Sequence, residues 1–215
     1  MGKDNKIQLF ENRIEDELKK CLKYIELDKR GKDVLAGKIL HLDGDKKYSE
    51  KSLRCYRSLG LEAIVKNIKE NEQVRFVKSL LERYRPDILV ITGHDGMLRG
   101  ETKYNDIYNY RNSRYFINSV MEARRWDNKG RDLVIFAGAC QSYYEAIIGA
   151  GANFASSPGR ILIDFMDPLI VAEKIATTDE SKYVTISDIE RNLRDGIKGV
   201  NGIGAMGKKK IVTKM

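Results

Sequence analysis

One histidine and one cysteine follow closely after apolar runs of the sequence. His94 comes two residues after the run at 87–92, and Cys140 comes three residues after the run at 133–137. A cysteine nucleophile needs a neighbouring base that removes its proton and later protonates the leaving amine. A Cys–His pair supplies both groups. These residue types therefore point to nucleophilic catalysis if the fold brings His94 and Cys140 together.

Glycines lie on both sides of this candidate pair, and they favour the same chemistry. Gly93 and Gly96 flank His94, and Gly138 precedes Cys140. Such residues let backbone N–H groups turn toward a substrate carbonyl, as an oxyanion hole requires. Cys140 is also expected where a helix begins, and the helix dipole there favours a thiolate. The alternative is a buried structural thiol beside a turn histidine.

The surrounding pattern predicts the elements that would position this pair. Apolar strands alternate with amphipathic helices, which is typical of a parallel sheet with right-handed crossovers. Ligands of such sheets bind beyond the carboxyl ends of the strands. Strands are expected at 34–42, 62–68, 87–92 and 133–137. Helices are expected at 9–27, 49–59, about 74–84, 115–125, 143–148, 167–176 and 187–197, with Ser49 and Asp167 as N-caps.

Composition excludes several classes of protein. The chain has 215 residues, a size that predicts one domain, and the longest apolar run, Ile88–Ile91, is far too short for a membrane span. No secretory signal is visible. Three widely spaced cysteines (Cys21, Cys55 and Cys140) argue against a disulfide framework and a zinc site. We therefore expect a protein of a reducing, cytoplasmic compartment. Cys21 is expected to pack in apolar surroundings, as is His41, and Cys55 is expected to lie in the core or to be partly exposed, without a catalytic role.

Four segments resemble the YabG-type sporulation proteases, which are related to the caspase, gingipain and legumain group (clan CD) of cysteine peptidases. The segments are Ile39–Asp45, Arg85–Asp95, Val134–Ser142 and Gly151–Pro158. The resemblance runs from about Lys38 to the C-terminus. It implies an α/β fold, a three-layer caspase-like sandwich with a mostly parallel central sheet and helices on both faces. We expect this peptidase domain over 34–215 and a helical N-terminal extension over 1–33.

The same resemblance implies an endopeptidase that needs no cofactor and cleaves after arginine. Cys140 would be the nucleophile and His94 the base, with the backbone N–H of Cys140 and that near Asp95 holding the oxyanion. The implied partners are spore-coat and germination proteins, in the mother cell or at the forming spore coat. An N-terminal region of the family is expected to be missing, and self-processing is expected at basic loops such as Arg30–Gly31.

An arginine-specific enzyme needs an acidic group in its pocket, because a carboxylate pairs bidentately with a guanidinium. The candidates for this acid are Asp95, Asp164 and Asp167. Each also has a purely structural explanation, Asp95 as a turn residue, Asp164 at a solvated edge and Asp167 as a helix cap. The sequence leaves the choice between them open. Asp43 is a further candidate that would orient His94, or a turn residue before Gly44. The expected substrate-binding residues are Asp95, Ser156, Ser157, Asp164 and Asp167.

Two other functions compete with proteolysis. The stretch Lys103–Phe116 mixes aromatic with basic residues, and the net charge is +8, so a nucleic-acid-binding module without catalysis is the alternative. The same loop also suits a substrate-binding flap. A phosphoacceptor or flavodoxin-like module would use Asp43 and Asp45.

The glycine-rich stretch at 202–208 matches nucleotide-binding patterns but lacks the strand and helix they need, so we expect a flexible tail with an edge strand.

Overall fold

A computed structural model describes residues 34–98, 100, 103–127 and 132–211 of the chain. The expected helix at 9–27 and its Cys21, the extension at 1–33 and the cleavage site at Arg30–Gly31 lie outside these residues. Within the described helices, none is both long and apolar enough to cross a membrane.

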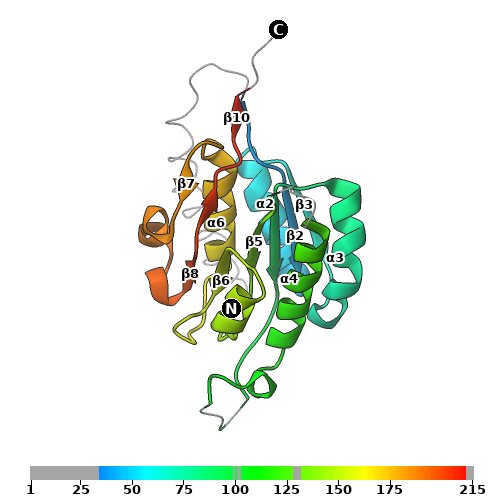
Figure 1. Ribbon diagram of the computed structural model, residues 1–215, viewed down its shortest axis with the longest axis vertical. Coiled ribbons are helices and arrows are strands. Elements are labelled where there is room, and N and C mark those ends of the chain that lie inside the picture. The colour runs from blue at the N-terminus through cyan, green and yellow to red at the C-terminus, as the bar shows by residue number, and fades with distance from the viewer. Residues whose placement is uncertain (1–33, 99, 101–102, 128–131, 212–215) are drawn as a thin grey trace, which may run out of the picture.

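A six-stranded sheet forms the centre of the molecule (Figure 1). Five neighbouring strands run parallel, and only the last edge strand is antiparallel to its neighbour. The prediction of a mostly parallel α/β sheet is therefore confirmed. In spatial order the strands are β3 (Ala63–Asn67), β2 (Ile39–Asp43), β4 (Ile88–Thr92), β5 (Val134–Ala137), β6 (Phe154–Ser156) and β8 (Val200–Gly202).

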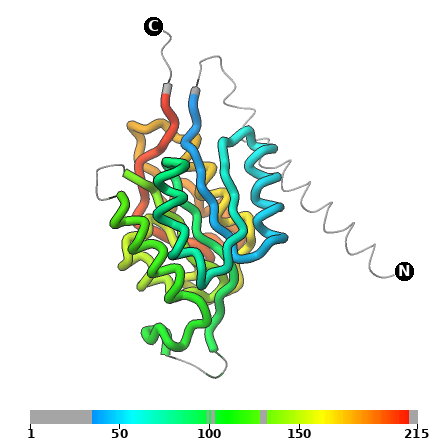
Figure 2. Tube along the Cα trace, turned by 90° about the vertical axis from the view of Figure 1, so that its right-hand side faces the viewer, coloured from blue at the N-terminus to red at the C-terminus, as the bar shows by residue number. Residues whose placement is uncertain are grey.

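Helices cover both faces of this sheet and complete three layers (Figures 1 and 2). On one face α2 (Lys46–Ser58) and α6 (Met166–Thr177) pack into one apolar core. On the other face α3 (Glu70–Tyr84), α4 (Ser113–Asp127) and α5 (Tyr144–Gly149) pack into a second core. Both faces of the central strands are consequently shielded from solvent.

Strand β4 explains why its sequence reads as a continuous apolar run. Ile88 and Val90 belong to the core under α2 and α6, whereas Leu89 and Ile91 belong to the core under α3 and α4. Successive side chains of a strand point to opposite faces. A strand covered on both faces therefore needs apolar residues at every position.

Several predicted boundaries were wrong, and side-chain capping explains the start of α2. Helix α2 begins at Lys46, because the Asp45 carboxylate accepts the N–H groups of Lys47 and Tyr48. Ser49, the predicted cap, lies inside the helix. Helix α6 begins at Met166, so Asp167 lies in its first turn and is not its N-cap.

The C-terminal part differs most from the prediction. Three short 3-10 turns, η3 (Ile186–Asp188), η4 (Glu190–Asn192) and η5 (Gly196–Lys198), replace the helix expected at 187–197. The glycine-rich stretch contributes the expected edge strand, β8, and then pairs β9 (Ala205–Met206) with β7 (Tyr183–Val184). Strand β10 (Lys210–Ile211) pairs with β1 (Val34–Leu35), which is separate from β2, so the strand expected at 34–42 is divided. The glycine-rich stretch at 202–208 therefore does not join a strand to a helix, as a phosphate-binding loop does.

Candidate active site

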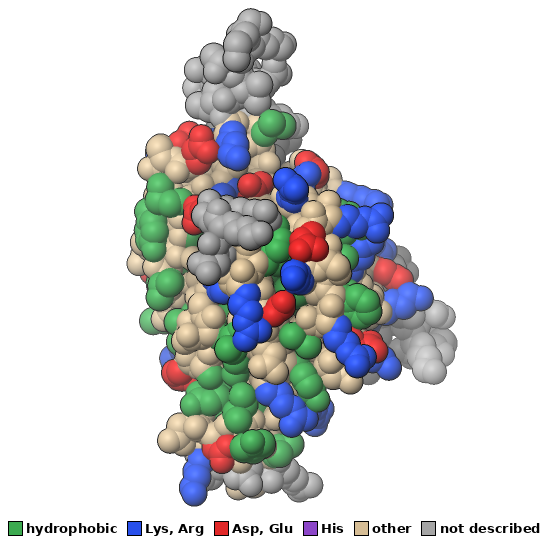
Figure 3. All heavy atoms as spheres, turned by 45° about the vertical axis from the view of Figure 1, so that its right-hand side comes forward, with side chains coloured by type: hydrophobic (Ala, Val, Ile, Leu, Met, Phe, Trp, Pro, Cys, Tyr) green, Lys and Arg blue, Asp and Glu red, His purple; other side chains and the backbone are tan. Residues whose placement is uncertain are grey.

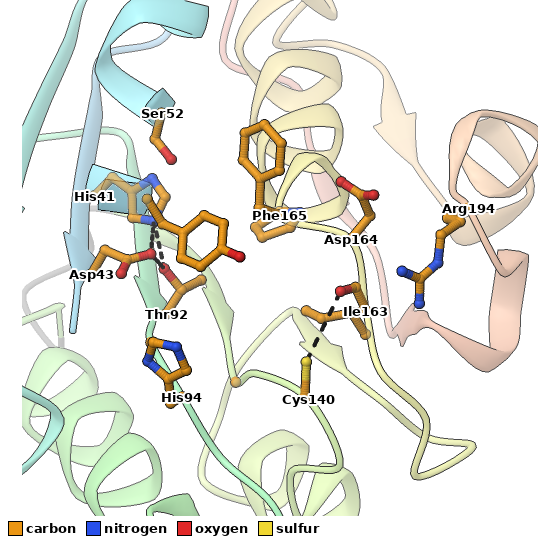
Figure 4. A pocket seen from close by; sticks show the side chains of 14 residues that line it. His41, Asp43, Ser52, Thr92, His94, Cys140, Ile163, Asp164, Phe165 and Arg194 are labelled. Atoms are coloured by element: carbon orange, nitrogen blue, oxygen red, sulfur yellow. Dashed lines mark hydrogen bonds and ion pairs between the residues drawn. The ribbon is translucent and has the colours of Figure 1, made fainter. Parts of the chain in front are cut away.

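A cavity of about 290 Å³ opens at the carboxyl ends of β2, β4 and β5. Strands β4 and β5 are direct neighbours, with Ile91 opposite Ala137, as the candidate pair required. The segments after these two strands carry His94 and Cys140, and both residues line the cavity (Figure 4). The fold thus brings the predicted base and the predicted nucleophile to one site.

The backbone of His94 is held firmly, while its ring is open to the cavity. Its N–H donates to Glu70 Oε1 at 2.6 Å, and its carbonyl accepts from Asn112 Nδ2 at 2.8 Å. The side chain is 57% exposed. Its Nε2 lies 3.7 Å from Asp45 Oδ2, and its Nδ1 lies 3.8 Å from Glu70 Oε1. Both ring nitrogens therefore face carboxylates beyond hydrogen-bonding distance.

Cys140 lies in a tight turn that requires a glycine at position 138. Gly138 has φ +111°, and a Cβ there would approach Ile147 and Ser156 to 3.3 Å. Cys140 itself is partly buried, and its Sγ lies 3.9 Å from the carbonyl oxygen of Ile163. The turn therefore presents the thiol at the cavity wall and does not bury it in the core. Cys55, in contrast, is fully buried beside Met166, as expected.

The Asp95 carboxylate joins the segment of His94 to the segment of Cys140. Its Oδ2 accepts the hydroxyls of Ser113 at 2.5 Å and Ser142 at 2.9 Å. Each hydroxyl in turn accepts a backbone N–H of the cysteine loop, Ser142 from Ala139 and Ser113 from Tyr143, both at 2.8 Å. One buried carboxylate therefore sets the two candidate catalytic segments relative to each other.

The other oxygen of Asp95 is occupied as well. Oδ1 accepts the N–H groups of Gly96 at 2.9 Å and Asn112 at 2.7 Å. Burial raises the pKa of Asp95, while these four hydrogen bonds favour its ionised form. With all four bonds made within the protein, Asp95 fits a role in shaping the turn around His94 better than the predicted role of binding substrate.

Three backbone donors at this edge have no acceptor within the described residues. The N–H groups of Ala139, Gln141 and Ser142 are all engaged, and so is that of His94. Those of Gly93, Asp95 and Cys140 donate to nothing in the described part of the chain. Gly93 and Cys140 line the cavity, so these N–H groups are available to a substrate oxygen.

His41, Asp43 and Thr92 form a buried chain of hydrogen bonds on another wall of the cavity. Thr92 Oγ1 donates to Asp43 Oδ2 at 2.6 Å and lies 2.7 Å from His41 Nε2. Tyr56 Oη lies 3.2 Å from His41 Nδ1. Burial lowers the pKa of His41 to about 3, so the ring is neutral at pH 7. His41 is the packed strand residue that the sequence predicts.

Asp43 does not orient His94 through a hydrogen bond. Its carboxylate accepts from Thr92 and, at 2.7 Å, from the N–H of Asp45. Sequence reasoning missed the two carboxylates nearest the His94 ring, those of Asp45 and Glu70. Glu70 follows β3, and an inspection of every strand end would have included it.

Of the remaining candidate pocket acids, only Asp164 lines the cavity. Its Oδ1 accepts the Met166 N–H at 3.0 Å. The Asp167 carboxylate is 1% exposed and accepts the backbone N–H groups of Asp164 and Arg194, both at 3.1 Å. Burial raises the pKa of Asp167 to about 6. Asp167 thus holds the backbone of Asp164 in place from the buried side of the cavity wall.

The two predicted wall serines are fully buried and do not line the cavity. Ser157 supports the cysteine turn from behind: its hydroxyl accepts the Gln141 N–H and donates to the carbonyl of Ile161. Sequence reasoning missed Tyr48, Phe165 and Arg194, which do line the cavity. Arg194 donates to the carbonyl of Leu162 and to Asp195. These residues come from α2, the start of α6 and the turns after β7, and no motif marks them.

The loop between His94 and α4 bears on the alternative of nucleic-acid binding. Of the aromatic residues predicted to stack on bases, Tyr110 in this loop and Phe116 in α4 are buried and unavailable, whereas Tyr104 and Tyr108 are exposed. Tyr110 stacks on Tyr143 with ring centroids 5.1 Å apart, and Arg160 lies over both rings. On the face of the molecule in Figure 3, Lys and Arg side chains are interspersed with Asp and Glu. That face therefore offers no continuous basic track for a phosphate backbone.

The chemistry available at this site does not include an evident metal centre. Among the described residues, no group of three or more His, Cys, Asp or Glu side chains is arranged to hold a metal ion. What the site does gather is a thiol, an imidazole and three backbone N–H groups without an acceptor in the described part of the chain. These are the groups that acyl transfer through a cysteine nucleophile uses.

Comparison with known proteins places the chain among peptidases. Residues 3–213 match the protein family described as YabG peptidase U57. Among curated proteins, the chain is 41% identical over 177 residues to the sporulation-specific protease YabG of Bacillus subtilis (strain 168). The alignment covers 82% of this chain and 61% of that relative, so the chain spans about three fifths of the relative's length.

Proposed function

This chain belongs to the YabG peptidase U57 family, and on that premise we propose that it is a cysteine endopeptidase that cleaves proteins after arginine during sporulation. The observation that carries the proposal is the cavity shared by His94 and Cys140 at the carboxyl ends of two adjacent parallel strands. In this proposal Cys140 is the nucleophile, and His94 is the general base and acid.

The reaction follows from the groups at the site. His94 takes the Cys140 proton, and the thiolate attacks the carbonyl carbon after the substrate arginine. The carbonyl oxygen becomes an oxyanion, held by the N–H groups of Cys140 and Asp95. The C–N bond then breaks as His94 protonates the leaving amine. Water, deprotonated by His94, hydrolyses the thioester and restores the thiol.

Asp164 is the acid that best suits a substrate arginine. It lines the same cavity as Cys140, whereas Asp95 and Asp167 spend their oxygens on hydrogen bonds within the protein. Arg194 lines this cavity too, and its charge would oppose a substrate cation. Its guanidinium is held by Leu162 and Asp195, so we place the substrate guanidinium against Asp164.

The test of the reaction is digestion of an unbiased peptide library, read by mass spectrometry. The wild type and Cys55→Ala should both cut after arginine, because Cys55 lies in the core away from the cavity. Cys140→Ala and His94→Ala should show no cuts while keeping the wild-type circular dichroism spectrum. Wild-type cleavage by either of these two variants would disprove the assigned pair.

Specificity has a separate test. Asp164→Asn should lower kcat/KM for a peptide with arginine before the cut by roughly 10- to 100-fold, since a charge-assisted pair is lost. The same peptide with citrulline, which is neutral and nearly isosteric, should change by less than about threefold. Equal losses of kcat/KM on both peptides would show that Asp164 does not bind the substrate arginine.

The sporulation role also sets the expected substrates and compartment. We propose spore-coat and germination proteins as substrates, in the mother cell or at the forming spore coat, and self-processing at basic loops. Intact-mass measurement of freshly purified wild type beside Cys140→Ala tests self-processing. A shorter wild-type chain beside an unshortened variant is the expected result, and identical masses would exclude it under those conditions.

A further inference from the structure

Glu70 occupies a place that two glycines keep open for it. It is the first residue of α3, and its side chain is only 14% exposed. A Cβ added at Gly44 would lie 2.1 Å from Glu70 Oε1, and one at Gly93 would lie 2.3 Å from the same atom. Real Cβ atoms do not approach so closely, so a side chain at either position would displace this carboxylate from its place. Gly93 also has φ +155°, a conformation that itself favours glycine.

The carboxylate in this place contacts the candidate base directly. Glu70 Oε1 accepts the His94 N–H at 2.6 Å, a short charge-assisted bond. The same oxygen lies 3.8 Å from His94 Nδ1, while Asp45 lies on the Nε2 side. Glu70 thus reaches both the backbone and the ring edge of a residue 24 positions away.

A helix-terminus role does not account for this arrangement. Glu70 and Glu72 both lie in the first turn of α3, where a negative charge favours the helix dipole. Glu72 is exposed and has the same advantage without touching His94. The dipole alone would require neither the glycines at 44 and 93 nor the 2.6 Å bond.

We propose that Glu70 is a positioning residue for His94. It fixes the backbone that carries the imidazole, and its charge stabilises the imidazolium that forms when Cys140 loses its proton. Glu70 touches neither substrate nor the thiol and acts only through His94. The inference rests on the proposed function, because it takes His94 as the base. Glu70 would thus be the third member of a catalytic triad, the acid that orients the base of the Cys–His pair.

Three variants separate charge, hydrogen bond and helix effects. Glu70→Gln keeps an oxygen acceptor for the His94 N–H and removes the charge. Glu70→Ala removes both, and Glu72→Gln is the matched control on the same helix turn. For each variant we would measure kcat, KM, the pH profile of kcat/KM on an arginine peptide, and the melting temperature.

Glu70→Ala should lower kcat by roughly 10- to 100-fold with KM within about twofold, because a misplaced base slows chemistry more than binding. In Glu70→Gln, the pH profile of kcat/KM should move to lower pH, because the variant removes the carboxylate charge 3.8 Å from the ring of the base. Glu72→Gln should match the wild type in all four measurements.

The outcomes distinguish the two proposals. If His94→Ala is inactive but Glu70→Ala and Glu70→Gln behave like Glu72→Gln, the positioning role is wrong and the proposed function stands. If His94→Ala retains cleavage, both are wrong. A loss of activity in Glu70→Gln with an unmoved pH profile also contradicts the charge role. If Glu70→Ala fails to fold, the pH profile of Glu70→Gln decides.

Discussion

Replacing Asp95 by Asn tests whether one carboxylate holds the two catalytic segments together. The substitution conserves size and leaves Oδ1 to accept from Gly96 and Asn112. It places an NH₂ group where Oδ2 accepts the hydroxyls of Ser113 and Ser142. Both hydroxyls already accept a backbone N–H, so neither can turn to the new donor without leaving its own hydrogen unpaired.

The magnitude follows from these contacts. Two hydrogen bonds to a charged acceptor contribute about 3–6 kcal/mol together. Relief from burying a carboxylate, whose pKa burial raises, and weak donation by the new amide offset about half of this. We therefore expect Asp95→Asn to lower the free energy of unfolding by about 2–3 kcal/mol. We also expect kcat/KM to fall about 10²-fold, because His94 and Cys140 lose their mutual register.

The assay is urea unfolding at pH 7 together with cleavage of an arginine peptide. The matched control is Asp106→Asn, because Asp106 caps the 3-10 turn η2 (Ile107–Asn109) in the same loop with a single bond to the Tyr108 N–H. That control should lose less than about 1 kcal/mol and keep its activity. If Asp95→Asn is as stable and active as Asp106→Asn, the carboxylate does not join the two segments.

Two further predictions concern the pH dependence of stability, and they have opposite signs. Burial lowers the pKa of His41 from 6.5 to about 3, so the unfolded chain binds a proton that the folded one does not. The contribution of this neutral imidazole to the free energy of unfolding is complete above pH 6.5 and is lost as pH falls, by roughly 3 kcal/mol at pH 4. Urea titrations of His41→Gln should therefore lack this loss. Equal pH slopes of the unfolding free energy for wild type and variant would contradict the prediction. Burial raises the pKa of Asp167 from 3.8 to about 6, so its contribution is complete below pH 3.8 and is lost as pH rises through 6. Between pH 4 and 7 the wild type should therefore lose roughly 2 kcal/mol relative to Asp167→Asn, and a constant difference between the two would disprove it.

The sequence predicted the parts of the fold that depend on local pattern. Buried parallel strands are apolar at successive positions, so β4 and β5 were recognisable, and the residues after them became candidates by topology alone. The α2 boundary was missed because its first turn, Lys46–Lys47, is polar and exposed and carries no apolar periodicity. At 187–197 the chain forms 3-10 turns instead, starting with a capping box between Thr185 and Asp188.

The partners of His94 were harder to predict, because they depend on tertiary contacts. Asp43 ends a strand buried at every position, and its carboxylate points to Thr92 and not to His94. Asp45 reaches the ring because β2 pairs with β4, and Glu70 does so because β3, which precedes α3, pairs with β2. Similarly, Asp164 and Asp167 are three residues apart, and only the packing of α6 decides which one faces the cavity.

The most direct test of the central claim is covalent labelling with a peptidyl-arginine acyloxymethyl ketone, followed by peptide mapping. The label should be found on Cys140 alone, should be lost in Cys140→Ala and His94→Ala, and should persist in Cys55→Ala. A matched leucine reagent should label far more slowly. Labelling of Cys55, equal labelling by the leucine reagent, or none on Cys140 in folded wild type would contradict the account.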